Sequence, residues 1–437
     1  MTLVCIDSMI SPTYHFGGLA YGNLHSMQSK TLTSYPQKAA LESLEKMYLA
    51  QQLGVIQFVL PPYQKDYIVL MEKIGLKKDD LDGLFNQLLP TAKAKVSALY
   101  SGAAAWMANA WTTTASSDSA DKRCHITIAN LASNVHRVLD VELTTMYAHY
   151  LFSDTHLFKL HPALTDACKD EGAANIIRLS SNDKGVYLFV YGESNTSIKP
   201  QKYPARQQKI VWEKLVENHQ LSDQSVCYLQ QSPQVIDAGV FHNDVIAFGL
   251  DRLLVVHEQA FVDQKTNLAK LKQQFETVCK QPLLIYEIST KDIPLQAVVD
   301  DYFFNSQLIR NKFGHYTLIC SDRCQNKNYM TKIVTQLSIM LGDKIDCEYI
   351  KIDESLKNGG GPACLRNMLE LNNDQIKSMP QHLLLTPTVY TQLKQYILNH
   401  YPLEFCLSNV MDPKKIQQFQ TIIRDCHDIL RLDLDKL

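Results

Sequence analysis

Residues 358–366 read Asn-Gly-Gly-Gly-Pro-Ala-Cys-Leu-Arg. Three successive glycines and a proline interrupt any helix or strand, because glycine permits positive φ and proline lacks a backbone donor. A short tethered loop of this kind can hold the thiol of Cys364 at the floor of a pocket. Taken alone, Cys364 is better explained as a buried structural thiol that follows a glycine turn. The other motifs of the chain change this balance.

The composition is that of a globular protein. The chain has 437 residues, of which 46% are hydrophobic and 20% are charged, and its formal net charge is −2. No linker rich in Pro, Gly or Ser divides it, so we expect a single domain over residues 1–437. The near-neutral charge provides no basic field for nucleic acid or for an anionic membrane, and we expect neither as a partner.

The eleven cysteines are scattered, and Cys320 and Cys324 form the closest pair. No CxxC motif occurs and no second Cys/His pair lies nearby, so a metal site at this pair is weakly supported. An odd number of cysteines, spread widely along the chain, is typical of a cytosolic protein whose thiols are reduced. Residues 1–12 lack the basic segment of a signal peptide, and no stretch has the length of a membrane span. We therefore expect a soluble, cytoplasmic protein.

Strand and helix patterns alternate along the chain. Strands are predicted at 55–60, 125–130, 186–191, 253–257, 283–288, 316–320 and 347–352. Helices are predicted at 37–53, 64–75, 79–89, 139–151, 207–218, 263–279, 292–301, 327–341, 386–398 and 412–431, and a polar loop at 112–121. This order predicts one α/β domain. Divergent repeats of a common unit are one way to build it, although residue matching reveals no repeat.

Two acidic motifs contain side chains suited to chemistry. Residues 170–175 (DEGAAN) place carboxylates beside small residues that leave room for a ligand. Residues 234–247 place His242 and Asp244 between two apolar runs that are interpreted as strands. Burying such a pair costs free energy unless its members pair or meet a charged ligand. An acidic surface turn and a structural histidine are the alternatives, but a His–Asn–Asp triplet is more typical of a site.

Cationic and flexible stretches accompany these motifs. His136 and Arg137 follow a predicted strand, and Arg206 precedes a predicted helix, where a positive charge opposes the helix dipole. Asn109 lies among small apolar residues and is either a core amide or a substrate contact. The glycine- and tyrosine-rich loop 11–26 either covers a site or is a surface turn, and its spacing is not that of a dinucleotide fingerprint.

A thiol, an imidazole and carboxylates together favour attack on a guanidinium group. A cysteine thiolate attacks electrophilic carbon, and a cationic substrate beside the thiol favours the thiolate. Glu171 and Asp244 can hold a guanidinium by forked hydrogen bonds, and His242 can protonate a leaving amine. A peptidase would instead need an oxyanion hole and no acidic clamp.

The motifs NGGGPACLR (358–366), GVFHNDVIA (239–247), DEGAAN (170–175) and GGLAYGN (17–23) resemble the N-succinylarginine dihydrolase family of the pentein, or guanidino-group-modifying, superfamily. The similarity runs in the family's order from about residue 11 to the C-terminal helices. It implies the pentein fold, a five-bladed α/β propeller with pseudo-fivefold symmetry and a central active site. It also implies hydrolysis of N2-succinyl-L-arginine to N2-succinyl-L-ornithine, two ammonia and carbon dioxide, in arginine catabolism by the succinyltransferase pathway.

Carried over by motif, the resemblance makes Cys364 the nucleophile and adds Glu171 and His242 to the catalytic set. The family's substrate-binding positions fall on Gly17, Gly18, Leu19, Ala20, Tyr21, Gly22, Asn23, Leu24, His25, Ser26, Asn109, His136, Arg137, Arg206, Asp244 and Asn358. The resemblance implies a homodimer, and the chemistry needs no metal and no cofactor. The segment Ile176–Arg178 and Trp111 depart from the family's pattern and bear on the shape of the pocket.

On these assignments Cys364 adds to the guanidinium carbon and passes through a thiouronium intermediate. The anionic groups of the substrate would meet Arg206, Arg137 and His136. The alternatives are another guanidine-modifying enzyme, such as an arginine deiminase or an amidinotransferase, a non-catalytic arginine-binding protein on the same fold, and a Cys/His peptidase.

Overall fold

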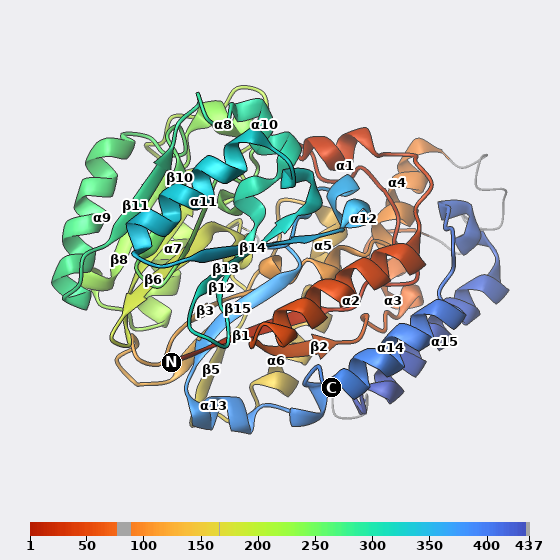
Figure 1. Ribbon diagram of the computed structural model, residues 1–437. Coiled ribbons are helices and arrows are strands. Elements are labelled where there is room, and N and C mark those ends of the chain that lie inside the picture. The colour runs from red at the N-terminus through yellow and green to blue at the C-terminus, as the bar shows by residue number, and fades with distance from the viewer. Residues whose placement is uncertain (77–88, 166, 434–437) are drawn as a thin grey trace.

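The computed structural model describes residues 1–76, 89–165 and 167–433 (Figure 1). Its strands are β1 (Thr2–Ser8), β2 (Ile56–Leu60), β3 (Trp111–Thr114), β4 (Cys124–Ile128), β5 (Phe158–His161), β6 (Ile176–Ser181), β7 (Lys184–Tyr191), β8 (Val226–Gln230), β9 (Ala247–Leu250), β10 (Leu253–His257), β11 (Leu284–Ile288), β12 (Gln307–Arg310), β13 (Tyr316–Ser321), β14 (Ile345–Ile350) and β15 (Arg366–Leu371). The described strands form five three-stranded sheets, in the orders β15-β1-β2, β3-β4-β5, β6-β7-β8, β9-β10-β11 and β12-β13-β14.

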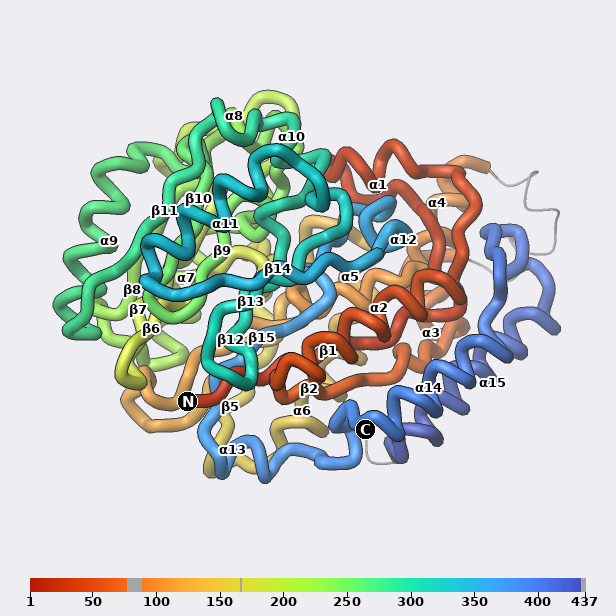
Figure 2. The backbone as a smooth tube through the Cα atoms, viewed as in Figure 1, coloured from red at the N-terminus to blue at the C-terminus, as the bar shows by residue number. Residues whose placement is uncertain are grey.

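The α-helices lie between and around these sheets. They are α1 (Leu24–Gln28), α2 (Pro36–Gln52), α3 (Tyr67–Lys73), α4 (Pro90–Leu99), α5 (Val135–Val138), α6 (Val141–Leu151), α7 (Lys209–Asn218), α8 (Pro233–Asp237), α9 (Gln264–Cys279), α10 (Leu295–Asp301), α11 (Asn328–Leu341), α12 (Asp353–Lys357), α13 (Asn373–Ser378), α14 (Pro387–His400) and α15 (Pro413–Ile429). Figures 1 and 2 show α14 and α15 side by side at the edge of the molecule, and α14 packs against α2. No helix in the described ranges is long and apolar enough to cross a bilayer.

All five sheets have the same strand pattern. The central strand pairs antiparallel with one neighbour and parallel with the other. Parallel neighbours need a crossover connection, and here the crossovers contain α2, α6, α7, α9 and α11. The chain therefore repeats one strand–strand–helix–strand unit five times. This confirms the predicted pseudo-fivefold α/β propeller, although no repeat was visible from residue matching.

Strands from the two ends of the chain close the ring. β15 pairs with β1 along its whole length, from Leu371 opposite Thr2 to Arg366 opposite Asp7. This closure supports the prediction that residues 1–437 form a single domain, which stays a prediction.

Burial explains which strands the sequence predicted well. The central strands β4 and β10 are buried at every position, and Leu253–Val256 of β10 appears in the sequence as a continuous apolar run. The inner strand of each sheet is the one that pairs antiparallel with the central strand, namely β3, β6, β9, β12 and β15. The inner strand β15 alternates between buried and half-buried residues, and its half-buried side chains Arg366, Met368 and Glu370 line a cavity on the propeller axis. Such short, alternating strands escaped prediction.

The structure confirms most of the predicted helices and strands and corrects four details. The first run of 234–247 contains helix α8, because Pro233 occupies the first helical turn, where its missing N–H is tolerated. Strand β3 takes up part of the loop predicted at 112–121, and β14 begins two residues before the strand predicted at 347–352. Arg206 precedes α7 by three residues, so the helix-dipole argument for it was wrong. The helix predicted at 79–89 falls, up to residue 88, outside the described residues.

A tight turn precedes each inner strand, and the five turns meet at one end of the axis. Four of the turns are the 3-10 helices Met107–Asn109, Gly172–Asn175, Asn243–Val245 and Phe303–Asn305, and the fifth spans 362–365. The following bonds join each turn or its flanking residue to the next: Asn109 Nδ2 to Glu171 O, Asn243 N to Asn175 Oδ1, Asn305 Nδ2 to Asp244 O, Ala363 N to Asn305 O, and Ala108 N to Cys364 O. The fold thus gathers five distant segments into one hydrogen-bonded ring.

Candidate active site

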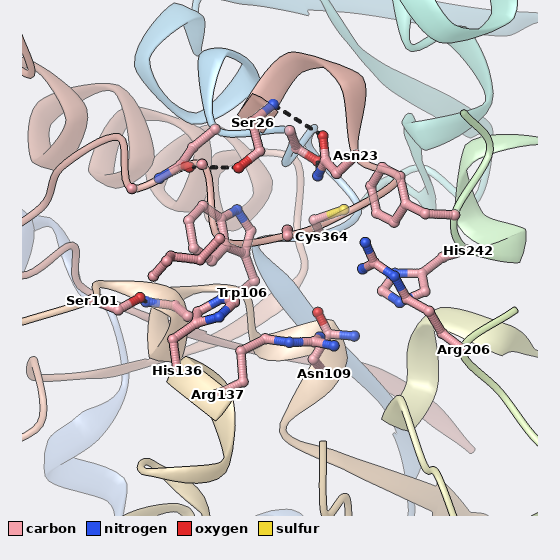
Figure 3. A pocket seen from close by; sticks show the side chains of 18 of the residues that line it. Asn23, Ser26, Ser101, Trp106, Asn109, His136, Arg137, Arg206, His242 and Cys364 are labelled. Atoms are coloured by element: carbon pink, nitrogen blue, oxygen red, sulfur yellow. Dashed lines mark hydrogen bonds between the residues drawn. The ribbon is translucent and has the colours of Figure 1, made fainter. Parts of the chain in front are cut away.

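A cavity opens over this ring of turns. Its lining includes thirteen of the predicted site residues: Gly17, Gly18, Leu19, Ala20, Asn23, Ser26, Asn109, His136, Arg137, Arg206, His242, Asn358 and Cys364. In Figure 3, Asn23 and Ser26 lie above Cys364, and Asn109, His136 and Arg137 lie below it. The structure therefore brings together segments that are separated by more than 300 residues.

Cys364 lies in the turn that precedes β15. Its Sγ donates a hydrogen bond to Asp244 Oδ2 at 3.3 Å and accepts one from Asn305 Nδ2 at 3.2 Å. Burial, and next the carboxylate of Asp244, raise the pKa of this thiol well above its usual range. The ligand-free thiol is therefore protonated at neutral pH, and a cation placed beside it would favour the thiolate.

Glu171 is fully buried and joins two basic side chains of the site. Its carboxylate accepts hydrogen bonds from Arg137 at both oxygens and lies 2.6 Å from His242 Nε2. Burial would raise the pKa of Glu171, but Arg137 and His242 together hold it well below its usual range. Burial lowers the pKa of His242, and Glu171 opposes that change. The carboxylate thus orients the imidazole while the imidazole faces the cavity.

The backbone around Glu171 shows why small residues follow it. Gly172 has φ +69°, and a Cβ there would lie 3.0 Å from the backbone of Asn109. Glycine is therefore needed for both the conformation and the close approach. The Glu171 N–H donates to Gln207 Oε1 at 2.8 Å, which fixes the turn from the other side.

Arg206 brings a buried positive charge to the cavity wall. Its Nη2 donates to the carbonyl of Tyr21 at 2.8 Å, and its guanidinium lies 4.9 Å from the centroid of the Phe241 ring. Burial lowers the pKa of Arg206 to about 10. Within the described part of the chain no carboxylate forms an ion pair with it. Glu171 attracts it from beyond ion-pair distance, and a desolvated cation with no carboxylate directly paired to it indicates an anionic ligand.

The loop 17–26 docks on the glycine loop. Asn23 caps α1 by accepting from Ser26 N at 3.2 Å and donates to the carbonyl of Gly359 at 3.2 Å. Ser26 Oγ donates to Asn358 Oδ1 at 3.4 Å, and Asn358 Nδ2 donates to the carbonyl of His15 at 3.1 Å. The two loops therefore form one wall of the cavity.

Six of the predicted site residues do not line the cavity. Glu171 and Asp244 lie behind it, in contact with His242 and Cys364 respectively. Tyr21, Gly22, Leu24 and His25 face neighbouring segments, and His25 Nε2, for example, lies 3.0 Å from the carbonyl of Val299. The substrate-binding role of all of these positions stays a prediction.

Several residues of this site were not among the predicted site residues. The lining also includes His15, Ser101, Ala103, Trp106, Phe241 and Gly359, and Asn305 contacts Cys364 from behind. Asn305 lies two residues before an inner strand, as Asn109 and Cys364 do. Knowledge of the repeat would have identified it.

The departures from the family's pattern lie away from the lining of this cavity. Ile176, Ile177 and Arg178 line the axial cavity behind the ring of turns, and Trp111 is fully buried in the core, edge-on to Phe152. In the part of the chain that the structure describes, no group of three or more His, Cys, Asp or Glu side chains is arranged to hold a metal ion.

Three comparisons place the chain among known proteins. A family model described as succinylarginine dihydrolase matches residues 2–435. The N-succinylarginine dihydrolases of Shewanella pealeana and Legionella pneumophila are 34% and 35% identical to it over 433 and 441 residues, covering 98% of this chain and 96% and 97% of theirs. The product-bound N-terminal domain of ArgZ, a cyanobacterial arginine dihydrolase, has a TM-score of 0.53 at 11% identity, over 85% of this chain and 99% of that one, and this shows the fold alone. The chain belongs to the succinylarginine dihydrolase family.

Proposed function

We propose that this enzyme hydrolyses N2-succinyl-L-arginine to N2-succinyl-L-ornithine, two ammonia and carbon dioxide. Besides the family membership, one observation on the cavity supports the proposal most directly. The cavity has a thiol in contact with a carboxylate, Cys364 with Asp244, and its wall also carries the buried cation Arg206, which has no described acidic partner. The substrate has a matching charge pattern, because its guanidinium is cationic and its succinyl and α-carboxylate groups are anionic.

In the first half of the reaction the guanidinium binds beside Cys364 and Asp244. Asp244 Oδ1 is buried and has no hydrogen-bond partner among the described residues, and a guanidinium N–H that reached it would supply the missing bond. The cation favours loss of the thiol proton, which passes by way of Asp244, its hydrogen-bond acceptor, to His242 as the thiolate adds to the central carbon and forms a C–S bond. His242, oriented by Glu171, then returns this proton to the departing amino group, which leaves as ammonia and yields a thiouronium adduct.

Water completes this cycle and a second one follows. Attack of water on the thiouronium carbon expels the sulfur and leaves a ureido group in place of the guanidinium. Cys364 adds to this carbon in turn, the second ammonia leaves, and water releases a carbamate. The carbamate decays to carbon dioxide and the amine of N2-succinyl-L-ornithine, so that two water molecules are consumed for two ammonia.

The basic side chains of the cavity have two roles. Arg206 is the proposed receptor for a carboxylate of the substrate, together with the buried His136, whose pKa is lowered well below its usual range by burial and next by Arg137. Arg137 donates both of its described side-chain hydrogen bonds to Glu171, so its first role is to hold that carboxylate. Asn109 and Asn358 supply amide groups to the remaining polar atoms of the substrate.

The decisive experiment counts ammonia with purified protein and N2-succinyl-L-arginine, with free L-arginine as the comparison substrate. We expect two ammonia for each N2-succinyl-L-ornithine formed, and at least 1000-fold loss of turnover in Cys364→Ala, on the order of the loss seen when a catalytic nucleophile is removed. One ammonia with a stable citrulline-type product would indicate a deiminase instead. Full turnover in Cys364→Ala would contradict the thiol mechanism.

We also propose that the protein acts in the cytoplasm as a homodimer. All eleven cysteines are free thiols in the structure, which fits a reducing compartment. The dimer rests on the family resemblance, and sedimentation velocity at micromolar concentration measures it directly. A monomer at every concentration would refute this part.

A further inference from the structure

Asn305 hydrogen-bonds the sulfur that the proposed reaction uses. Its side chain is fully buried, and its Nδ2 lies 3.2 Å from Cys364 Sγ and 3.1 Å from the carbonyl oxygen of Asp244. Its Oδ1 accepts from the N–H of Cys364 at 3.3 Å. The NH₂ group and the oxygen of the Asn305 amide therefore form hydrogen bonds with Cys364 and Asp244, the two residues beside which the guanidinium is proposed to bind.

These neighbours fix the orientation of the amide. A half-turn of the Asn305 amide would set its oxygen against the carbonyl oxygen of Asp244 and its NH₂ group against the N–H of Cys364. Both contacts would be repulsive, because acceptor would face acceptor and donor would face donor. An N–H of Asn305 must therefore point at the sulfur.

We propose that Asn305 is a catalytic residue, whose amide donates a hydrogen bond to the Cys364 thiolate and stabilises it as the nucleophile. This inference rests on the thiol chemistry proposed above. The sulfur needs such a donor, because burial and the carboxylate of Asp244 both disfavour its ionised form. A neutral amide supplies the hydrogen bond without a positive charge that would repel the guanidinium.

The charged and titratable groups around this sulfur come from several elements. Asp244 and His242 come from the turn before β9, and Tyr302 from the residue before the 3-10 helix Phe303–Asn305. Arg366 on β15 and Arg206 act on Asp244 and Tyr302 from further away. Among these groups Asp244 is the acceptor for the thiol proton and Asn305 is the donor to the sulfur.

Asn109 provides an internal comparison. It occupies the same position before its inner strand, and its Nδ2 donates to the carbonyl of Glu171 at 2.7 Å, as that of Asn305 donates to Asp244. Holding the backbone of an acidic residue is therefore common to both asparagines. The contact with sulfur is the additional feature of Asn305.

The test measures alkylation of Cys364 by iodoacetamide in the substrate-free protein, at several pH values between 7 and 9, for the wild type, Asn305→Ala and Asn305→Asp. In this range the thiolate is the minor form, so the rate falls tenfold for each unit by which the pKa rises. Alanine removes the donor and opens space around the sulfur. Aspartate keeps the shape and adds a negative charge. Peptide mass spectrometry resolves the site, and the exposed Cys406 serves as control.

We expect rates in the order wild type, Asn305→Ala, Asn305→Asp, with an alanine rate about 10- to 100-fold below that of the wild type, the usual effect of one hydrogen bond to a charged group. Cys406 should react equally in all three proteins. With N2-succinyl-L-arginine, kcat should fall similarly while KM changes less than about threefold. Easier access alone would make Asn305→Ala faster than the wild type, so the order separates ionisation from access.

An alanine variant that is alkylated as fast as the wild type, or a loss confined to KM, would overturn the proposal. Should Asn305→Asp fail to fold, Asn305→Ala decides alone, because it buries no charge. The alkylation order does not depend on the substrate. Failure of the proposed function would therefore appear as absent turnover of N2-succinyl-L-arginine by the wild type, with the alkylation order intact.

Discussion

At the residue scale, Arg206 is the side chain whose surroundings say most about the ligand. It is buried, it lines the cavity, and its described contacts are a carbonyl oxygen and an aromatic face. Both contacts leave its charge unneutralised. A substrate carboxylate would complete its environment, and this is an interaction that the ground state and the transition state share.

Replacing Arg206 by methionine should therefore raise KM for N2-succinyl-L-arginine about 10- to 100-fold and change kcat less than about threefold. A hydrogen bond to a charged group contributes roughly 1.5–3 kcal/mol, and binding that is uniform along the reaction affects KM alone. Initial-rate kinetics measure both constants. Arg424→Met removes the same charge from an exposed position of α15 and should leave both unchanged. A loss in kcat at unchanged KM would exclude this role.

At the element scale, the cavity wall depends on how closely two loops approach. Gly359 has φ +83°, and a Cβ at this position would lie 2.0 Å from the side-chain amide of Asn23. Gly314 has almost the same conformation, with φ +84°, but a Cβ there would meet nothing within 4 Å. Comparing substitutions at the two glycines therefore separates the effect of backbone strain from the effect of a clash with Asn23.

Gly314→Ala should cost about 1–2 kcal/mol of unfolding free energy, the strain of a left-handed non-glycine residue. Gly359→Ala should cost more, because it must also displace Asn23, and it should lower kcat/KM at least about tenfold through the displaced loop 17–26. Urea denaturation and steady-state kinetics of both variants give the comparison. Equal losses in both variants would show that the contact with Asn23 contributes nothing.

At the scale of the whole molecule, one arginine ties three sheets together. Arg178 on β6 donates to Asp118 Oδ2 at 2.8 Å, in the segment between β3 and β4, and to Glu370 Oε2 at 2.6 Å, on β15. All three side chains are largely buried. Glu370 lies four residues along β15 from Arg366, a span of about 13 Å, so this network is remote from Cys364.

Arg178→Met should therefore destabilise the protein by about 3–5 kcal/mol, because it leaves buried carboxylates without their cation. The kcat should stay within about twofold of the wild-type value, since the reacting groups lie at the other end of the axis. Lys344→Ala breaks the exposed pair with Asp346 and should cost at most about 1 kcal/mol. Urea denaturation measures both variants. An Arg178→Met variant that loses activity while its free energy of unfolding stays unchanged would contradict this assignment of Arg178 to stability.

The sequence predicted the elements whose burial leaves a local pattern. The central strand β10 is apolar at four of its five positions, and long helices such as α2, with Pro36 at its start, carry their signals within a few residues. It also predicted the reactive groups, since a thiol after three glycines and a His–Asn–Asp triplet are unusual in ordinary core segments. These features depend on short-range chemistry alone.

Only the tertiary structure decided which of these groups meet and which ones complete the site. Asn305 carries no distinctive motif, and it touches Cys364 because the propeller brings five pseudo-equivalent turns to one axis. Closure by β15 against β1 is a pairing across more than 350 residues, which no short-range pattern encodes. The sequence by itself determined the thiol chemistry and the helices and central strands. The ring of turns, the pairing of Arg137 with Glu171 and the unneutralised Arg206 follow from contacts that no local pattern encodes.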